Sequence, residues 1–290
     1  MIKQFQEFLK NGESSGARYK MAIPQQLPMG GLGSNIGKSV GKSLEFLDYR
    51  PYQPGDDLRH LDWGAFARSD SLIVKVFREE INPHVDILID GSASMDLEGT
   101  KKAEAAISLA AFLASASQNS GFSHRAWLAS NGCSQLINSN FAPTNWQGIS
   151  FSWSDDISAS LQKKSPEWKN RGIRIVISDL LWRVDPFHFL WKIANGAALT
   201  IVIQILNQEE IDGPEAGSYR LIDSETKQFK EILIDQNLIN SYREKVRKHQ
   251  QNWQMACKKY QGIFSFVSAE SFLIDWKLCE LLKSKVIQPT

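Results

Sequence analysis

Cysteine is scarce in this chain, and its three cysteines form no recognisable motif. Cys133, Cys257 and Cys279 are far apart, odd in number and without a CxxC pair. This argues against a disulfide framework and against a cysteine-based zinc site. We therefore expect reduced cysteines inside a protein from a reducing compartment.

Long apolar runs are also missing. The first residues, MIKQFQEFLKNGESS, carry acids where a signal peptide needs an apolar stretch. The most apolar segment, AAISLAAFLASAS, is too short and too rich in serine to span a bilayer. The expectation is a cytoplasmic protein with no transmembrane segment.

An excess of charge of one sign is the third absence. The chain has 33 Lys and Arg against 32 Asp and Glu, a net charge of +1, so nothing global attracts nucleic acid or an acidic membrane. The basic segment SYREKVRKHQ is interpreted as a solvated helix face, because nucleic-acid binding favours a broader basic surface interleaved with aromatic residues. No nucleic-acid partner is expected.

Hydrophobic residues, in contrast, are plentiful at 42%, and short apolar strands alternate with helices along most of the chain. VDILID, RIVISD and TIVIQIL are apolar almost throughout, as strands covered on both sides must be. Asn131-Gly132 between two strand-like segments predicts a tight hairpin and hence an antiparallel edge strand. The pattern predicts an α/β fold with a doubly wound, mostly parallel sheet and helices on both faces.

Oxygen-bearing side chains follow two of these strands. Asp90, Ser92 and Ser94 form a D-x-S-x-S pattern directly after the first strand, and Asp179 follows RIVIS. In doubly wound sheets, ligands bind beyond the carboxyl ends of the strands. A hard cation such as Mg²⁺ suits carboxylate and hydroxyl oxygens, so we expect a metal site formed by these four residues.

Two other interpretations of this stretch stay open. In the first, Ser92 and Ser94 only cap the next helix while Asp90 accepts backbone N–H bonds. In the second, a serine acts as a nucleophile, which requires an activating base. None of the five histidines follows a strand in a triad-like order, which disfavours the second interpretation.

The combination of D-x-S-x-S and a later strand-end aspartate resembles a von Willebrand factor A domain. The resemblance implies a metal-ion-dependent adhesion site for Mg²⁺, Mn²⁺ or Ca²⁺, with Asp90, Ser92 and Ser94 on its first loop and Asp179 on its third. The family places a threonine on a second loop, but SFSWSDDISASL has none there. Ser154 is the nearest hydroxyl and the expected replacement, with Asp155 the nearest acid and Ser152 an outside candidate.

The segment SLEFLDYRPYQPGDDLRHLDWGAFARSDSLIVKVFREE resembles the signature of the bacterial family called domain of unknown function 58. The matching signature residues are Arg50, Tyr52, Gly55, Asp56, Asp57, Arg59, Asp62, Trp63 and Arg68. Their alternating charges predict Arg–carboxylate pairs that lock an irregular segment in place, with partner recognition or acid–base chemistry as alternatives. The expected division is a signature segment over 1–82, packed on a von Willebrand factor A-like domain over 83–290.

These resemblances imply a non-enzymatic interaction module whose metal site binds an acidic group of a partner. Family members are often encoded beside MoxR-type AAA+ ATPases, so the expected partner is such an ATPase, acting in the assembly or activation of protein complexes. The alternatives are a metal-dependent hydrolase and a scaffold whose metal site is degenerate.

Overall fold

The computed structural model describes residues 5–22, 44–52, 61–69, 71–79, 84–154, 156–222, 229–276 and 278–290. The chain divides into two units. One unit, here called the α/β unit, contains residues 1–27 together with 83–290, and the other, the small unit, contains residues 28–82.

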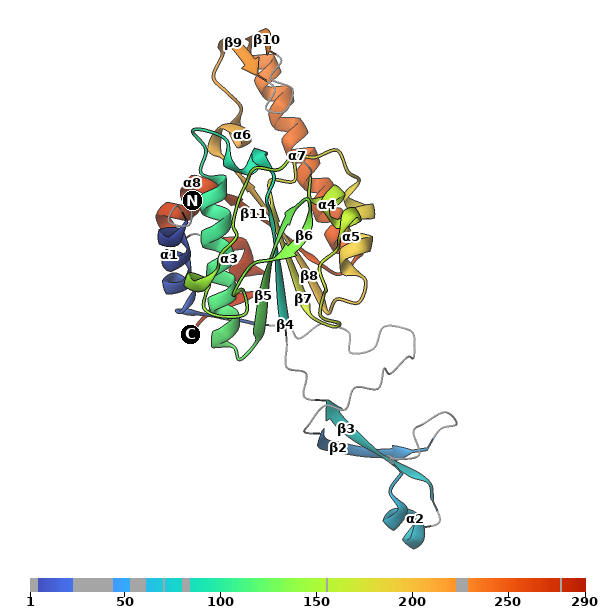
Figure 1. The fold of residues 1–290 in the computed structure, drawn as a ribbon. Helices are drawn as coiled ribbons and strands as arrows, with labels where there is room; N and C mark the ends of the chain where they lie inside the picture. The colour runs from blue at the N-terminus through green and yellow to red at the C-terminus, as the bar shows by residue number, and fades with distance from the viewer. Residues whose placement is uncertain are drawn as a thin grey trace. The chain divides into compact units, whose positions relative to one another are not determined.

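A six-stranded sheet forms the centre of the α/β unit (Figure 1). Its strands in chain order are β4 (His84–Asp90), β5 (Ser123–Ser130), β6 (Gly132–Gln135), β7 (Ile173–Ser178), β8 (Leu199–Leu206) and β11 (Ile263–Ser268). Their order across the sheet is β11-β8-β7-β4-β5-β6, and every pair is parallel except the β5–β6 hairpin at one edge. This is the 3-2-1-4-5-6 order of a doubly wound sheet, so the expected fold class and its antiparallel edge strand are confirmed.

Helices cover both faces of this sheet, as Figure 1 shows. One face carries α1 (Gln6–Gly16), α3 (Lys102–Asn119) and α8 (Ala269–Asp275); the other carries α4 (Ile157–Lys163), α5 (Pro186–Ala194) and α7 (Gln236–Lys259). The shorter elements are β1 (Tyr19–Met21), η2 (Ala93–Asp96), η3 (Pro143–Asn145), α6 (Gln208–Asp212), β9 (Gly217–Ile222), β10 (Phe229–Ile234), α9 (Cys279–Lys283) and β12 (Ile287–Pro289).

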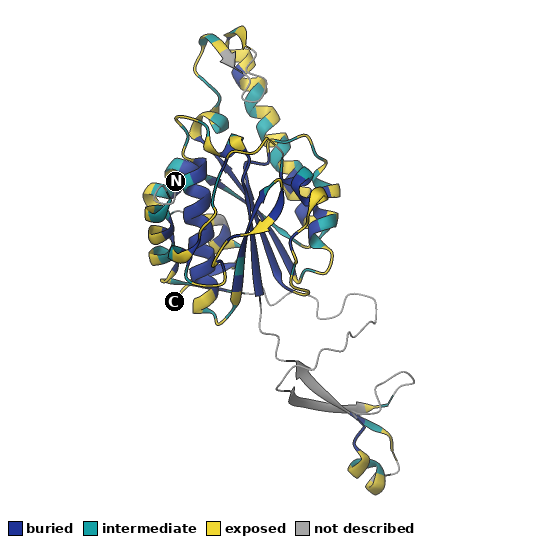
Figure 2. Cartoon of the chain, viewed as in Figure 1, coloured by how far each residue is buried: buried dark blue, intermediate teal, exposed yellow. Residues whose placement is uncertain are grey.

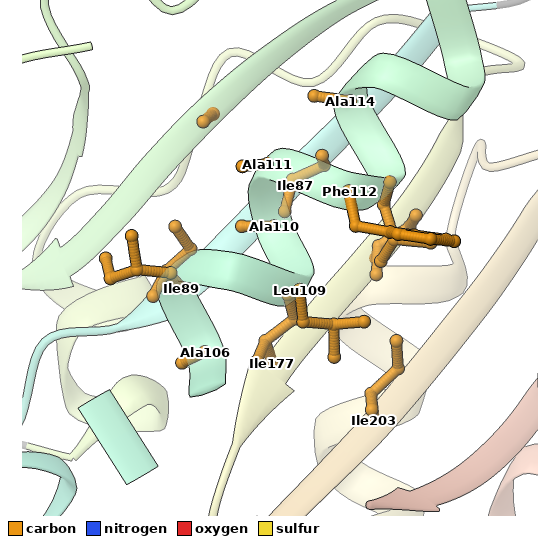
Figure 3. Packing of buried hydrophobic residues seen from close by; sticks show 14 of the residues in the cluster. Ile87, Ile89, Ala106, Leu109, Ala110, Ala111, Phe112, Ala114, Ile177 and Ile203 are labelled. Carbon is orange, nitrogen blue, oxygen red and sulfur yellow. The ribbon is translucent and has the colours of Figure 1, made fainter. Parts of the chain in front are cut away.

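The core lies between the sheet and α3. Strands β4, β7 and β8 are buried along their whole length, and α3 is buried from Lys102 to Ser117 except at the partly exposed Glu104 (Figure 2). In Figure 3, isoleucines of the sheet such as Ile87 and Ile177 lie against Leu109 and Ala110 of α3. The alanines of α3 keep the helix close to the sheet because they project little beyond the backbone.

The N-terminal helix α1 packs on the outer side of α3, which is why most of α3 is buried on both sides. Its apolar face includes the buried Leu9, and two glycines, Gly12 and Gly16, lie directly against the backbone carbonyls of Ser108 and Phe112. A Cβ atom at either glycine would collide with those carbonyls, so both positions need the absence of a side chain. The close approach makes α1 part of the α/β unit.

Strand β1 continues this N-terminal contact by pairing antiparallel with β12, with Tyr19 opposite Pro289. Residues 5–22 therefore belong with the α/β unit, whereas the expected boundary assigned all of residues 1–82 to one N-terminal segment. The amphipathic face of α1 indicates that the helix docks, but it does not indicate on which surface. The observed division of the chain differs from the expected one for that reason.

The small unit contains an antiparallel pair and a short helix: β2 (Leu44–Pro51), α2 (Trp63–Ser69) and β3 (Ile73–Glu79). The register of the pair shifts between Phe46 and Asp48, which marks a bulge. Asp62 begins α2, because its Oδ1 accepts the backbone N–H of Ala65 at 2.9 Å.

Strands β9 and β10 form an antiparallel hairpin that leads into the long helix α7 (Figure 1). Within the part of the chain that the structure describes, none of the helices combines the length and apolarity needed to cross a membrane.

Candidate metal site

Two buried aspartates lie where the strand order of the sheet reverses. Asp90 is the last residue of β4, and Asp179 directly follows β7, the neighbouring parallel strand. Their exposed fractions are 0% and 1%. In a doubly wound sheet this reversal is the usual ligand-binding position, so the structure brings together the two acids that the sequence separates.

The Asp90 carboxylate is held by two hydrogen bonds from its own edge of the sheet. Its Oδ1 accepts the backbone N–H of Ser92 at 3.0 Å, and its Oδ2 accepts the hydroxyl of Ser178 at 2.5 Å. Burial and then the nearby negative charge of Asp179 raise the pKa of Asp90 to about 6, although these hydrogen bonds oppose the rise. The Asp90 carboxylate is therefore disfavoured in its charged form by its burial and by the neighbouring Asp179.

Ser92 and Ser94 lie together beside Asp90, with their Oγ atoms 3.0 Å apart. Ser92 is at the start of the short 3-10 helix η2, but its side chain makes no capping hydrogen bond. The capping interpretation therefore holds only for Asp90, which does accept a backbone N–H. Two hydroxyls remain adjacent to a buried carboxylate, as the first loop of a metal site requires.

The second loop reaches the site through its backbone. Trp153 forms a parallel bridge with Ser92, and its carbonyl accepts the N–H of Ala93 at 2.8 Å. Ser152 and Ser154, on either side of Trp153, both have exposed side chains. Asp155 lies outside the described residues. The next acid, Asp156, caps α4 by accepting the N–H of Ala159 at 2.7 Å.

Lys102 is a component that the motif does not predict. This first residue of α3 is fully buried, and its Nζ lies 3.0 Å from Oδ2 of Asp179 and 2.7 Å from Oε1 of Glu210. Burial alone would lower the pKa of Lys102, but the two carboxylates outweigh it and raise that pKa, so the side chain is an ammonium. Its sequence context, the start of an alanine-rich helix, resembles an ordinary exposed helix end.

His249 on α7 also lies near the third loop, which the sequence did not indicate. It makes a hydrogen bond with the backbone of Leu180, and its Nε2 accepts the indole N–H of Trp253 at 3.2 Å. Burial lowers the pKa of His249, which keeps the ring neutral at neutral pH. Nε2 already accepts the Trp253 indole N–H, so that nitrogen is not free to act as a general base.

The donor set fits a hard divalent cation. Carboxylate and hydroxyl oxygens are the ligands that Mg²⁺ and Ca²⁺ prefer, and a cation would offset the repulsion between the Asp90 and Asp179 carboxylates. Across the described ranges, His, Cys, Asp and Glu form no group of three or more that could hold a metal ion. The candidate site thus consists of Asp90, Ser92, Ser94 and Asp179, with Lys102 bound to its far side.

A scan against protein-family models matches residues 48–252 to "Protein of unknown function DUF58". The chain belongs to this family. Curated relatives of this DUF58 chain include uncharacterized proteins of Mycobacterium bovis (Mb1516) and Mycobacterium tuberculosis (Rv1480). Each is 24% identical over 236 residues, which cover 75% of this chain and 72% of the relative.

Three solved structures are also similar to this DUF58 chain. BatB, a conserved hypothetical protein from Bacteroides thetaiotaomicron, has 14% identity and a TM-score of 0.36, covering 69% of this chain and 99% of its own. An aerotolerance-related membrane protein from Bacteroides fragilis has 14% identity and a TM-score of 0.39, covering 69% of this chain and 99% of its own. A von Willebrand factor type A protein from Catenulispora acidiphila has 10% identity and a TM-score of 0.37, covering 70% of this chain and 42% of its own. These identities carry no inference about activity.

The signature residues of DUF58 are only partly described. Gly55, Asp56, Asp57 and Arg59 lie outside the described residues, and of Arg50 only the backbone in β2 is placed. Tyr52 donates its backbone N–H to Leu72, Asp62 caps α2, and Trp63 and Arg68 are exposed on that helix, where the Trp63 ring contacts Phe66. The expected Arg–carboxylate locking of this segment stays a prediction.

The raised pKa of Asp90 predicts an unusual pH dependence of stability. The folded state binds the Asp90 proton at about pH 6, whereas the ordinary value is 3.8, so between these values the folded state holds more protons than the unfolded chain. Without metal, the contribution of Asp90 to the free energy of unfolding should rise as the pH falls through this window. Urea denaturation in EDTA, compared with Asp90→Asn, measures it; identical pH profiles for the two proteins would contradict the prediction.

Proposed function

We propose that this DUF58 chain is a non-enzymatic interaction module that binds an acidic group of a partner protein through a divalent cation. Asp90, Ser92, Ser94 and Asp179 would hold the ion, and Ser154 would contribute from the second loop. When bound, Mg²⁺, or Mn²⁺ or Ca²⁺ in its place, offers an open coordination position to a carboxylate. The meeting of two buried carboxylates and two hydroxyls at the reversal point of the sheet carries this proposal.

The surroundings of the site suit a protein partner. Trp153, whose backbone bridges to Ser92, is 38% exposed, and Leu181, two residues after Asp179, is 51% exposed. Exposed large apolar side chains beside a polar centre are typical of protein–protein contacts, and tryptophan is enriched among residues that dominate binding energy. A partner carboxylate would thus be flanked by apolar contacts that exclude water.

The proposed partner is a MoxR-type AAA+ ATPase, and the proposed process is the assembly or activation of other protein complexes. The support for this partner is the membership of the chain in DUF58, because the expectation of a MoxR-type partner came from the resemblance to that family. A cytoplasmic location belongs to the proposal as well, because the three cysteines are free.

The test is a pull-down of a co-expressed MoxR-type ATPase with the full chain, with Mg²⁺ or EDTA in the buffer. We expect retention in Mg²⁺, and its loss in EDTA and in Asp90→Ala, because the cation bridges the two proteins. Glu231→Ala, an exposed acid on β10, is the matched control and should bind normally. Retention that ignores both EDTA and Asp90→Ala would exclude a metal bridge.

A second candidate is a scaffold with a degenerate metal site. The observation that favours it is the Lys102 ammonium on Asp179, together with a second loop that offers an exposed serine in place of threonine. Calorimetric titration with Mg²⁺ distinguishes the two candidates. The hydrolase alternative has no comparable support, since Nε2 of His249 already accepts the Trp253 indole N–H.

A further inference from the structure

Lys102 is a charged side chain buried inside the α/β unit. Lysine is almost never fully buried unless it is paired, because an isolated ammonium loses its hydration. Here the exposed fraction is 0%, and Nζ is bonded to two carboxylates that lie 77 and 108 residues further along the chain. Such long-range pairing indicates a dedicated position, since flexible surface lysines meet acids in their own helix turn.

The two partners of Lys102 have different surroundings. Asp179 is buried and faces the Asp90 side of the site, while its other oxygen accepts the N–H of Leu181 at 3.2 Å. Glu210 is 22% exposed and belongs to α6, where its Oε2 accepts the backbone N–H of Asn207. The ammonium therefore connects the third loop of the candidate site to the first turn of α6.

The balance of charge around Lys102 has a direct consequence for metal binding. Asp90, Asp179 and Glu210 supply three carboxylates, and Lys102 supplies one permanent cation among them. Two cations in a buried region repel each other strongly, because the effective dielectric constant there is far below that of water. A divalent ion that shares Asp179 must therefore compete with the ammonium already bound to it.

We propose that Lys102 is a resident cation of this site, which weakens divalent-metal binding and yields Asp179 by moving toward Glu210 when the metal enters. This inference rests on the proposed metal site and adds the residue that sets its affinity. The ammonium has three donors and the shorter of its two contacts is already to Glu210, so an alternative position is at hand. Metal entry is thereby coupled to α6, whose Glu210 carbonyl accepts the Tyr242 hydroxyl of α7 at 2.7 Å.

The experiment is calorimetric titration of the full chain with Mn²⁺ alone, for wild type and Lys102→Met. Methionine keeps much of the length of lysine and is tolerated inside proteins, but it removes the charge. The variant is expected to bind Mn²⁺ at least about tenfold more tightly, because the competing cation is gone. The matched control is Lys101→Met: Lys101 is 56% exposed and pairs with Glu104, so its affinity should stay at the wild-type value.

Thermal unfolding gives a second readout. Lys102→Met leaves Asp179 and Glu210 without their counter-ion, so its melting temperature should fall without metal and recover more on Mn²⁺ addition than that of wild type. If Lys102→Met does not fold, the double variant Lys102→Met with Glu210→Gln replaces it in both measurements. The second substitution removes the carboxylate charge left without a partner.

Equal or weaker Mn²⁺ binding by the variant overturns the inference and leaves the metal-bridge proposal standing if wild type binds. Binding by the variant alone, with a silent wild type, supports the resident cation and counts against metal capture by the natural chain. The two proposals can therefore fail separately.

Discussion

Replacing Trp253 by alanine is expected to lower the free energy of unfolding by about 3–5 kcal/mol, the usual cost of emptying a large aromatic site in a core. Trp253 is fully buried on α7, where its ring packs edge-on against Trp182 at 5.5 Å and Phe189 at 5.6 Å. The loss also reaches the candidate site. The indole of Trp182 donates to the Ser178 hydroxyl, and that hydroxyl donates to Asp90.

The measurement is urea denaturation followed by circular dichroism, with Trp191→Ala as the matched control. Trp191 lies on α5 but is 58% exposed, so its truncation should change stability by no more than about 0.5 kcal/mol. A loss for Trp253→Ala as small as that of the control would mean that the aromatic cluster does not stabilise this face of the sheet.

Asp86→Ala is expected to cost a similar amount, about 3–5 kcal/mol, because it breaks a buried ion pair by removing one partner. The Asp86 carboxylate has an exposed fraction of 0%, accepts the Trp127 indole N–H and the Lys169 backbone N–H at 2.9 Å each, and pairs with Arg125 at 3.2 Å. Burial alone would raise the pKa of Asp86, yet hydrogen bonds from His84, Lys169 and Trp127 outweigh it and lower that pKa.

The lowered pKa fixes the pH range of this effect. The stability from Asp86 is fully present above its ordinary pKa of 3.8 and is lost as the pH falls through the lower folded value. Chemical denaturation at neutral pH should therefore show the whole difference from wild type. Lys101→Ala, which breaks only an exposed pair with Glu104, should cost no more than about 1 kcal/mol. A loss for Asp86→Ala in that small range would refute the assignment.

Local pattern predicted most of the fold. The apolar strands at β4, β7 and β8 are buried on both sides as their composition required, and Asn131-Gly132 forms the β5–β6 turn, with Gly132 at φ 92°. The segment SYREKVRKHQ, interpreted as a solvated helix face, lies in α7, and Asp235 caps the start of that helix. In each case the deciding signal lies within a few residues, which is why the sequence sufficed.

The candidate site was predictable only in part, for the same reason. Asp90, Ser92, Ser94 and Asp179 follow strands, so knowledge of the sheet places them at one edge. Lys102 and His249 come from helices whose local sequence shows only a basic end, and they reach the third loop through contacts distant in the chain. The packing of α1 was not predictable either, because the need for its glycines arises only from their contact with the backbone of α3.

The pairing of β1 with β12 has a consequence for biosynthesis. During translation, Tyr19 emerges from the ribosome early, but its partner Pro289 is made only after β11, α8 and α9. The nascent N-terminal strand must therefore wait, exposed or held by a chaperone, until synthesis of the α/β unit is nearly finished. The native state of this unit therefore cannot be complete before β12 has been synthesised.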